Sequence, residues 1–127
     1  MESKTSIGRV RGLGSARHGA HHWWRQRLTA GGNLLLMVWF VASIARLPGY
    51  ERQDVVNWLS SPWAALPMAL LILNVFYHFR LGLQVVIEDY QHEESRFVMM
   101  VLLNLFVVAA GATAIFSILK IAFGAAA

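Results

Sequence analysis

The sequence predicts an all-α membrane protein with three transmembrane helices. Of its 127 residues, 57% are hydrophobic and only 14% are charged, which is too apolar for a soluble domain, whose surface is mostly polar. The apolar residues gather in three blocks, residues 28–45, 63–87 and 97–123. Each block is close to the roughly 20 residues that a helix needs to cross a bilayer. Helices are expected because strand edges in lipid would leave backbone groups without hydrogen bonds.

Residues 1–20 are predicted to form a basic, mostly disordered arm, and residues 21–127 the membrane anchor domain. Before the first apolar block a single acid, Glu2, is outnumbered by basic residues. These are Lys4, Arg9, Arg11, Arg17, Arg25 and Arg27. Basic segments beside a first helix stay in the cytoplasm, so we expect the N-terminus inside. Nucleic acid is the usual rival partner for such an arm, but three spans favour the lipid bilayer and no nucleic acid.

A tract of histidines and tryptophans precedes the first block. It comprises His18, His21, His22, Trp23 and Trp24. Tryptophans favour the headgroup layer, so this tract is predicted to anchor the first helix, with zinc or copper binding by the histidines as the minor interpretation. Arg27 lies at the membrane boundary, where an arginine is tolerated if it snorkels or meets an anion. Small residues at positions 30–32 predict the close approach of another helix.

The remaining segments are connections and a packing helix. Residues 46–62 are rich in turn-forming residues and predict an outer loop, with one interfacial turn at residues 55–59. Residues 88–96 are acidic and predict the inner loop. The third block contains one strongly polar residue, Asn104, and Lys120 is predicted to snorkel at its outer end.

The second block carries the residues with the most distinctive chemistry. His78 lies about 14 Å from the inner end of this block, near the middle of a roughly 30 Å core. A helix turns about 100° per residue, so Asp89 falls within roughly 20° of His78, and Gly82 lies on the same face as a recess for a flat ligand. An imidazole at this depth forms an interhelical hydrogen bond or ligates a cofactor, and the residues alone leave both open. Arg80 lies roughly 160° around the helix from His78, and a lipid phosphate, a partner subunit and a buried carboxylate all remain open as its partner.

Cysteine is absent from the chain. Disulfides, iron–sulfur clusters and thiolate catalysis therefore cannot be built from it. Redox chemistry would need a histidine-bound or carried cofactor. A buried imidazole, with a carboxylate and a phenol where its helix meets water, is what a haem beneath a proton-coupled quinone site requires.

Two motifs resemble the smaller hydrophobic membrane anchor of succinate dehydrogenase, respiratory complex II, in bacteria related to mitochondria. They are Gly19-Ala20-His21-His22-Trp23-Trp24 with Arg27-Leu28-Thr29-Ala30, and His78-x-x-Leu81-Gly82-x-Gln84-x-x-x-x-Asp89-Tyr90. The resemblance covers about residues 14–123. It implies a heterotetramer of a flavoprotein subunit, an iron–sulfur subunit and two anchors, whose helices form a six-helix bundle of which this chain makes half.

The resemblance also implies a shared b-type haem. His78 would be one axial ligand to the iron, and the second histidine would come from the other anchor. His21 and Arg27 match positions near the haem propionates, and Gly82 belongs to the haem surroundings. Arg80 departs from the pattern, which has an uncharged residue at this position.

A ubiquinone site is implied at the end of the second helix. Tyr90 would hydrogen-bond a quinone carbonyl, and Asp89 would shape the site or its proton path. The alternatives are an anchor of a fumarate reductase or another cytochrome b quinone oxidoreductase, or a structural anchor without a cofactor. We expect no catalysis by this chain alone, and a multi-pass location in the bacterial inner membrane, with the mitochondrial inner membrane as the second choice.

Overall fold

The computed structural model describes residues 17–124, which form four helices and no strand. The long helices are α2 (Arg17–Ala45), α4 (Pro62–Tyr90) and α5 (Glu93–Ala122), and the short helix is α3 (Arg52–Leu59). All three long helices are long and apolar enough to cross a membrane. The predicted all-α class with three spans is therefore confirmed. Residues 1–16, which make up most of the predicted arm, lie outside the described residues.

The helices are longer than the predicted apolar blocks. Helix α2 begins at Arg17 instead of residue 28, so it includes the histidine and tryptophan tract. Helix α4 continues to Tyr90 instead of residue 87, and α5 begins at Glu93 instead of residue 97. Hydropathy marks the residues that suit lipid, whereas a helix satisfies its own backbone hydrogen bonds and continues into the polar layer. The predicted turn at residues 55–59 lies within α3.

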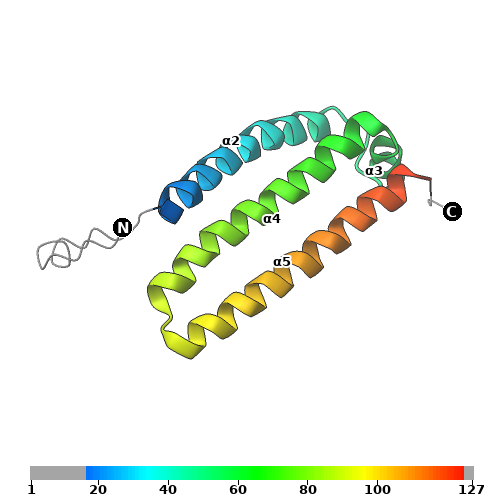
Figure 1. Ribbon diagram of the computed structural model, residues 1–127. Helices are drawn as coiled ribbons and strands as arrows, with labels where there is room; N and C mark the ends of the chain where they lie inside the picture. Colours follow the sequence, from blue (N-terminus) through cyan, green and yellow to red (C-terminus); the bar gives the residue numbers. More distant parts are fainter. Residues whose placement is uncertain (1–16, 125–127) are drawn as a thin grey trace, which may run out of the picture.

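The three long helices lie side by side in one layer with α4 in the middle (Figure 1). Helix α4 packs against α2 and α5, while α2 and α5 do not contact each other within residues 17–124. Helix α3 covers one end of the layer and contacts α4 and α5. Only a few apolar side chains are buried: Leu59, Ala64, Ala65, Leu71, Leu81, Ile87, Leu103 and Ile118. Both broad faces of the layer are therefore open to lipid or to further protein.

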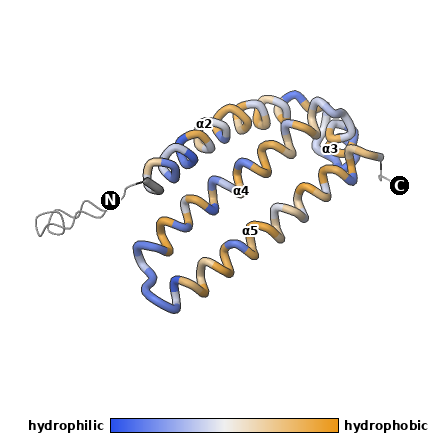
Figure 2. The backbone as a smooth tube through the Cα atoms, in the orientation of Figure 1, coloured by the Kyte–Doolittle hydropathy of each residue, from blue (hydrophilic) through white to orange (hydrophobic). Residues whose placement is uncertain are grey.

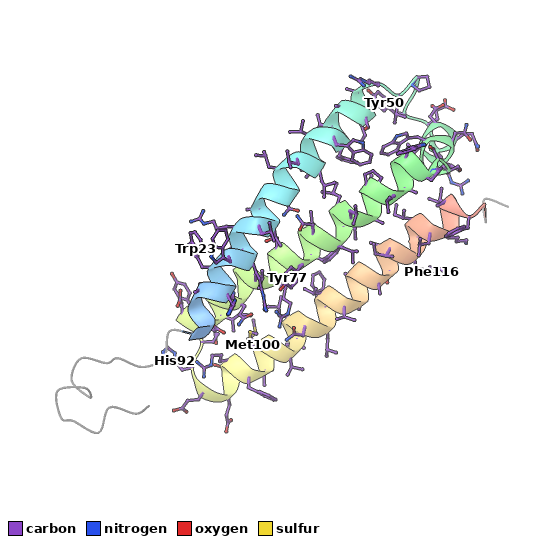
Figure 3. All side chains as sticks on the ribbon, turned by 45° about the horizontal axis from the view of Figure 1, so that its top comes forward. Trp23, Tyr50, Tyr77, His92, Met100 and Phe116 are labelled. Carbon is purple, nitrogen blue, oxygen red and sulfur yellow. The ribbon has the colours of Figure 1, made fainter. Side chains whose placement is uncertain are left out.

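Polar residues are concentrated at the two ends of the layer (Figure 2). The start of α2 and the turn between α4 and α5 are hydrophilic and lie at the same end. Figure 3 places Trp23 and His92 at this end and Tyr50 at the other. The basic start of α2 and the acidic end of α4 therefore share one side of the predicted membrane.

Helices α2 and α4 are joined by an asparagine bridge. Asn74 Nδ2 donates to the backbone carbonyl of Thr29 at 2.8 Å and to Asn33 Oδ1 at 2.7 Å. Gly32 makes room for this amide, because a Cβ atom at residue 32 would lie 2.9 Å from Asn74 Nδ2. Close approach and interhelical hydrogen bonds hold helices together in lipid, because the hydrophobic effect contributes little to helix association there.

Replacing Gly32 with Ala should weaken this bridge, because the new methyl group displaces the Asn74 amide. Gly31 is the matched control, since a Cβ atom there meets nothing within 4 Å. Both variants gain the same helix propensity, about 1 kcal/mol. We expect Gly32→Ala to have a free energy of unfolding about 1–2 kcal/mol below that of Gly31→Ala. Denaturant titration in detergent measures the difference, and equal stabilities would contradict the bridge.

Candidate functional site

A groove of about 1080 Å³ opens between the start of α2 and the second half of α4. This volume is just above the roughly 300–1,000 Å³ found for small-molecule sites. Polar and charged side chains contribute much of its lining: His21, His22, Arg25, Gln26, Arg27, His78, Arg80, Gln84 and Glu88. Three arginines against one glutamate make the groove suited to an anionic ligand.

His78 lies on this groove, partly buried where α2 and α4 meet. Its Nδ1 atom is 2.9 Å from Thr29 Oγ1 on α2. The interhelical hydrogen bond that was one of the two interpretations of this histidine is therefore present. This bond uses Nδ1, and the other ring nitrogen, Nε2, makes no hydrogen bond with the side chains of residues 19–124. The imidazole thus has one nitrogen for the neighbouring helix and one for a ligand.

Gly82, where a recess for a flat ligand was predicted, lies one turn after His78 and is not among the residues that line the groove. A Cβ atom at Gly82 would lie 3.4 Å from Gln26 Nε2, across from it on α2. Two buried polar atoms on this part of α2, His22 Nε2 and Gln26 Oε1, have no hydrogen-bond partner. Unpartnered buried polar atoms are costly, so their position beside the groove is consistent with a polar ligand group there.

The arginines of the groove are held in different ways. The Arg27 guanidinium carbon lies 5.5 Å from the centroid of the Trp23 ring, a cation–π contact at the start of α2. Arg80 Nε donates to Asn104 Oδ1 on α5 at 2.6 Å, and Asn104 Nδ2 donates to the Met100 carbonyl at 2.7 Å. Arg80 therefore has the partner that sequence reasoning did not find, and it links α5 to the groove.

Asp89 and Tyr90 form a separate group at the end of α4. Both are exposed, Tyr90 to 76%, and neither lines the groove. Helix α4 is continuous from residue 62 to 90, so Asp89 remains on the stripe of His78, about 16 Å further along the axis. The structure thus brings His21, Arg27 and His78 to one groove and leaves Asp89 and Tyr90 at the membrane boundary.

Metal ligands do not cluster in the described part of the chain. Within residues 17–124, no three side chains of His, Cys, Asp or Glu are close enough to hold a metal ion together. A closed zinc site needs about four such ligands. A haem iron differs from such a site, because the haem ring supplies four nitrogens and a single imidazole can complete the contribution of one chain.

Over residues 1–125 the chain matches the family described as succinate dehydrogenase/fumarate reductase transmembrane subunit. The chain belongs to this family. The family resemblance of its two sequence motifs is thereby confirmed, and the three long helices are those of a membrane anchor of this family.

Similar curated proteins within this family are described as succinate dehydrogenase hydrophobic membrane anchor subunits. The Rickettsia bellii protein is 32% identical over 87 residues, 68% of this chain and 70% of the relative. The Rickettsia conorii protein is 30% identical over 105 residues, 81% of this chain and 83% of the relative. The Paracoccus denitrificans protein is 28% identical over 114 residues, 90% and 88% of the two chains. No solved structure matches the chain.

Sequence reasoning about this family member missed two polar contacts of its site, those of Thr29 and Asn104. A signal for Asn104 was available, because an amide in one apolar block and an unpaired arginine in the next lie at similar depth. Each is seven residues from the predicted inner end of its block, Arg80 before Ile87 and Asn104 after Phe97. Thr29 gave no such signal, since a threonine is common in membrane helices and usually bonds its own backbone.

Replacing Asn104 with Leu should destabilise the protein by about 1–3 kcal/mol, because the Arg80 guanidinium loses its acceptor. Arg80→Leu should leave Asn104 Oδ1 without its donor, at a similar cost. In the double variant neither group is left without its partner, so the two effects should not add, with a coupling energy of about 1.5–3 kcal/mol. Denaturant titration of the four proteins in detergent measures this cycle, and additive effects would show that the contact is not stabilising.

Proposed function

We propose that this chain is a membrane anchor subunit of a bacterial succinate dehydrogenase, in which it supplies one axial ligand to a b-type haem and part of a ubiquinone reduction site. The observation that carries the proposal is the position of His78, a partly buried imidazole on a large groove between two spans. Its Nε2 atom forms no hydrogen bond among the described residues. The descriptions of the bacterial relatives favour succinate dehydrogenase over fumarate reductase.

The residues around the groove fit a haem. His78 offers a nitrogen ligand, and Leu81 and Val85 add apolar wall. Gly82, one turn after His78, is assigned to the haem surroundings next to this wall. Arg25, Arg27 and Arg80 line the same groove and suit the two haem carboxylates. His21 also lines it and would lie near those carboxylates. When bound, the haem supplies a one-electron carrier, and this chain's residues bind and orient it.

Half of the haem site would come from another protein. The layer of three helices is open on both broad faces, so one wall of the groove is left to be covered. We assign the second axial histidine and that wall to a second three-helix anchor, which completes a six-helix bundle. The flavoprotein and iron–sulfur subunits would bind at the end that carries the start of α2, which the basic residues orient to the cytoplasm.

Asp89 and Tyr90 are assigned to ubiquinone. Two electrons and two protons convert a quinone to a quinol, and each added electron makes the carbonyl oxygen more basic. A phenol that donates to this oxygen stabilises it more as charge develops than in the ground state. Tyr90 is exposed at the end of α4, where such a donor reaches the headgroup layer. Asp89, beside it, provides a carboxylate for proton supply from the cytoplasmic side.

The His78→Ala variant of the complete complex should lose the b-type haem spectrum. The reduced-minus-oxidised difference spectrum of membranes measures this, and a shifted spectrum would indicate a replacement ligand. His92→Ala is the matched control, because His92 is exposed at the turn before α5. An unchanged spectrum in His78→Ala would refute ligation by this residue.

The Tyr90→Phe variant should reduce quinone roughly tenfold more slowly, since one hydrogen bond worth about 1.4 kcal/mol in the transition state is lost. The haem content and the rate of succinate oxidation with a soluble acceptor should stay unchanged. Tyr50→Phe is the control, because Tyr50 is a similarly exposed phenol, 71% against 76%, at the opposite end of the layer. Full quinone reductase activity in Tyr90→Phe would remove this residue from the site.

A further inference from the structure

We infer that Thr29 is a positioning residue that fixes the tautomer of His78, so that Nδ1 carries the proton and Nε2 presents its lone pair to the groove. This inference rests on the proposed function, because the lone pair matters only if His78 ligates the haem. Thr29 is the one polar residue that is buried among residues 19–124, with 7% of its surface exposed. It lies on α2, directly opposite His78 on α4.

The contacts of the Thr29 hydroxyl decide the direction of the hydrogen bond. Thr29 Oγ1 is 2.7 Å from the Arg25 carbonyl oxygen and 3.1 Å from the Gln26 carbonyl oxygen. A hydroxyl has one hydrogen, and carbonyl oxygens only accept. Two oxygens at 2.7 Å repel each other unless a hydrogen lies between them, so the hydrogen points to the backbone of α2. The hydroxyl can then only accept from its third neighbour.

That third neighbour is His78 Nδ1, at 2.9 Å. Because the hydroxyl accepts, Nδ1 must be the protonated nitrogen. A neutral imidazole has a single N–H, so Nε2 carries the lone pair that a metal ligand needs. The tautomer of His78 is thus set by a backbone carbonyl of α2, relayed through one hydroxyl group.

Thr29 is held in place for this role by a second contact with α4. Its carbonyl oxygen accepts from Asn74 Nδ2 at 2.8 Å. Asn74 and His78 are one helical turn apart, so residues on two successive turns of α4 form hydrogen bonds with the same residue of α2. The asparagine bridge therefore holds the backbone of Thr29 opposite the imidazole, and the bond to the Arg25 carbonyl holds the hydroxyl.

A hydrogen bond from Nδ1 makes Nε2 more basic, which strengthens a metal ligand. A more basic ligand favours ferric over ferrous iron, because the oxidised iron carries more positive charge. Removing the acceptor should therefore raise the midpoint potential of the haem and weaken its binding. Changes to such partners cost roughly 10–100-fold in metal affinity. A tenfold loss of preference for the ferric state corresponds to about 59 mV in a one-electron couple.

The experiment compares three variants of the complete complex in membranes. Thr29→Val keeps the shape but cannot accept a hydrogen bond, while Thr29→Ser keeps the hydroxyl. Thr113→Val is the matched control, since Thr113 Oγ1 makes the same bond to the carbonyl four residues earlier, at 2.8 Å, on an exposed face of α5. Redox titration and haem content should show a raised potential and less haem in Thr29→Val only. A wild-type potential and haem content in Thr29→Val would overturn the inference, as would an equal change in Thr29→Ser.

A measurement on the unaltered complex covers the case in which Thr29→Val does not assemble. Nitrogen-15 NMR of the complex with its haem in the diamagnetic ferrous state, and with only this chain labelled at histidine, reports which ring nitrogen of His78 carries the proton. A protonated Nδ1 is expected, and a protonated Nε2 would overturn the inference. The His78→Ala spectrum distinguishes failure of the proposed function from failure of this inference. If His78→Ala retains the haem, ligation by His78 is refuted. If His78→Ala loses the haem and Thr29→Val is unaffected, only the role of Thr29 is refuted.

Discussion

The arrangement of this layer depends on one constraint: a polar side chain in the middle of a membrane must find its partner within the protein, because lipid offers none. Helix α4 carries three such side chains, Asn74, His78 and Arg80. The first two bond to Thr29 on α2, and the third bonds to Asn104 on α5. Helix α4 lies in the middle because its polar groups face both ways. The same contacts leave the groove between α2 and α4 with a fixed imidazole.

The fold could be predicted from the sequence because the thickness of the bilayer fixes how much apolar chain each span needs. The three blocks were therefore in the right places. Their ends were not, since α2 begins at Arg17 and includes a tract that hydropathy placed before the first span. Nothing in the hydropathy of His21 or Trp23 shows that the backbone there is already helical.

The site could be predicted only in so far as it follows one helix. The period of α4 was enough to place His78, Gly82 and Asp89 on one stripe, and an unbroken helix from residue 62 to 90 confirms that geometry. The contacts of Thr29 and Asn104 depend on how α2 and α5 are rotated and shifted against α4. The rotation and shift of one helix against another arise from packing between helices, so they cannot be derived from the sequence period of a single helix.

The contact between Arg80 and Asn104 has an electrostatic consequence. An amide oxygen binds the guanidinium but does not neutralise it, so a full positive charge stays on the wall of the groove at membrane depth. In surroundings of low dielectric constant such a charge acts over several ångströms with little screening. In the proposed haem site, this charge would stabilise an electron on the haem, in opposition to the effect of a more basic imidazole. The two neighbouring helices would then tune the proposed haem from opposite directions, α2 through a hydrogen bond and α5 through the charge that it holds in place.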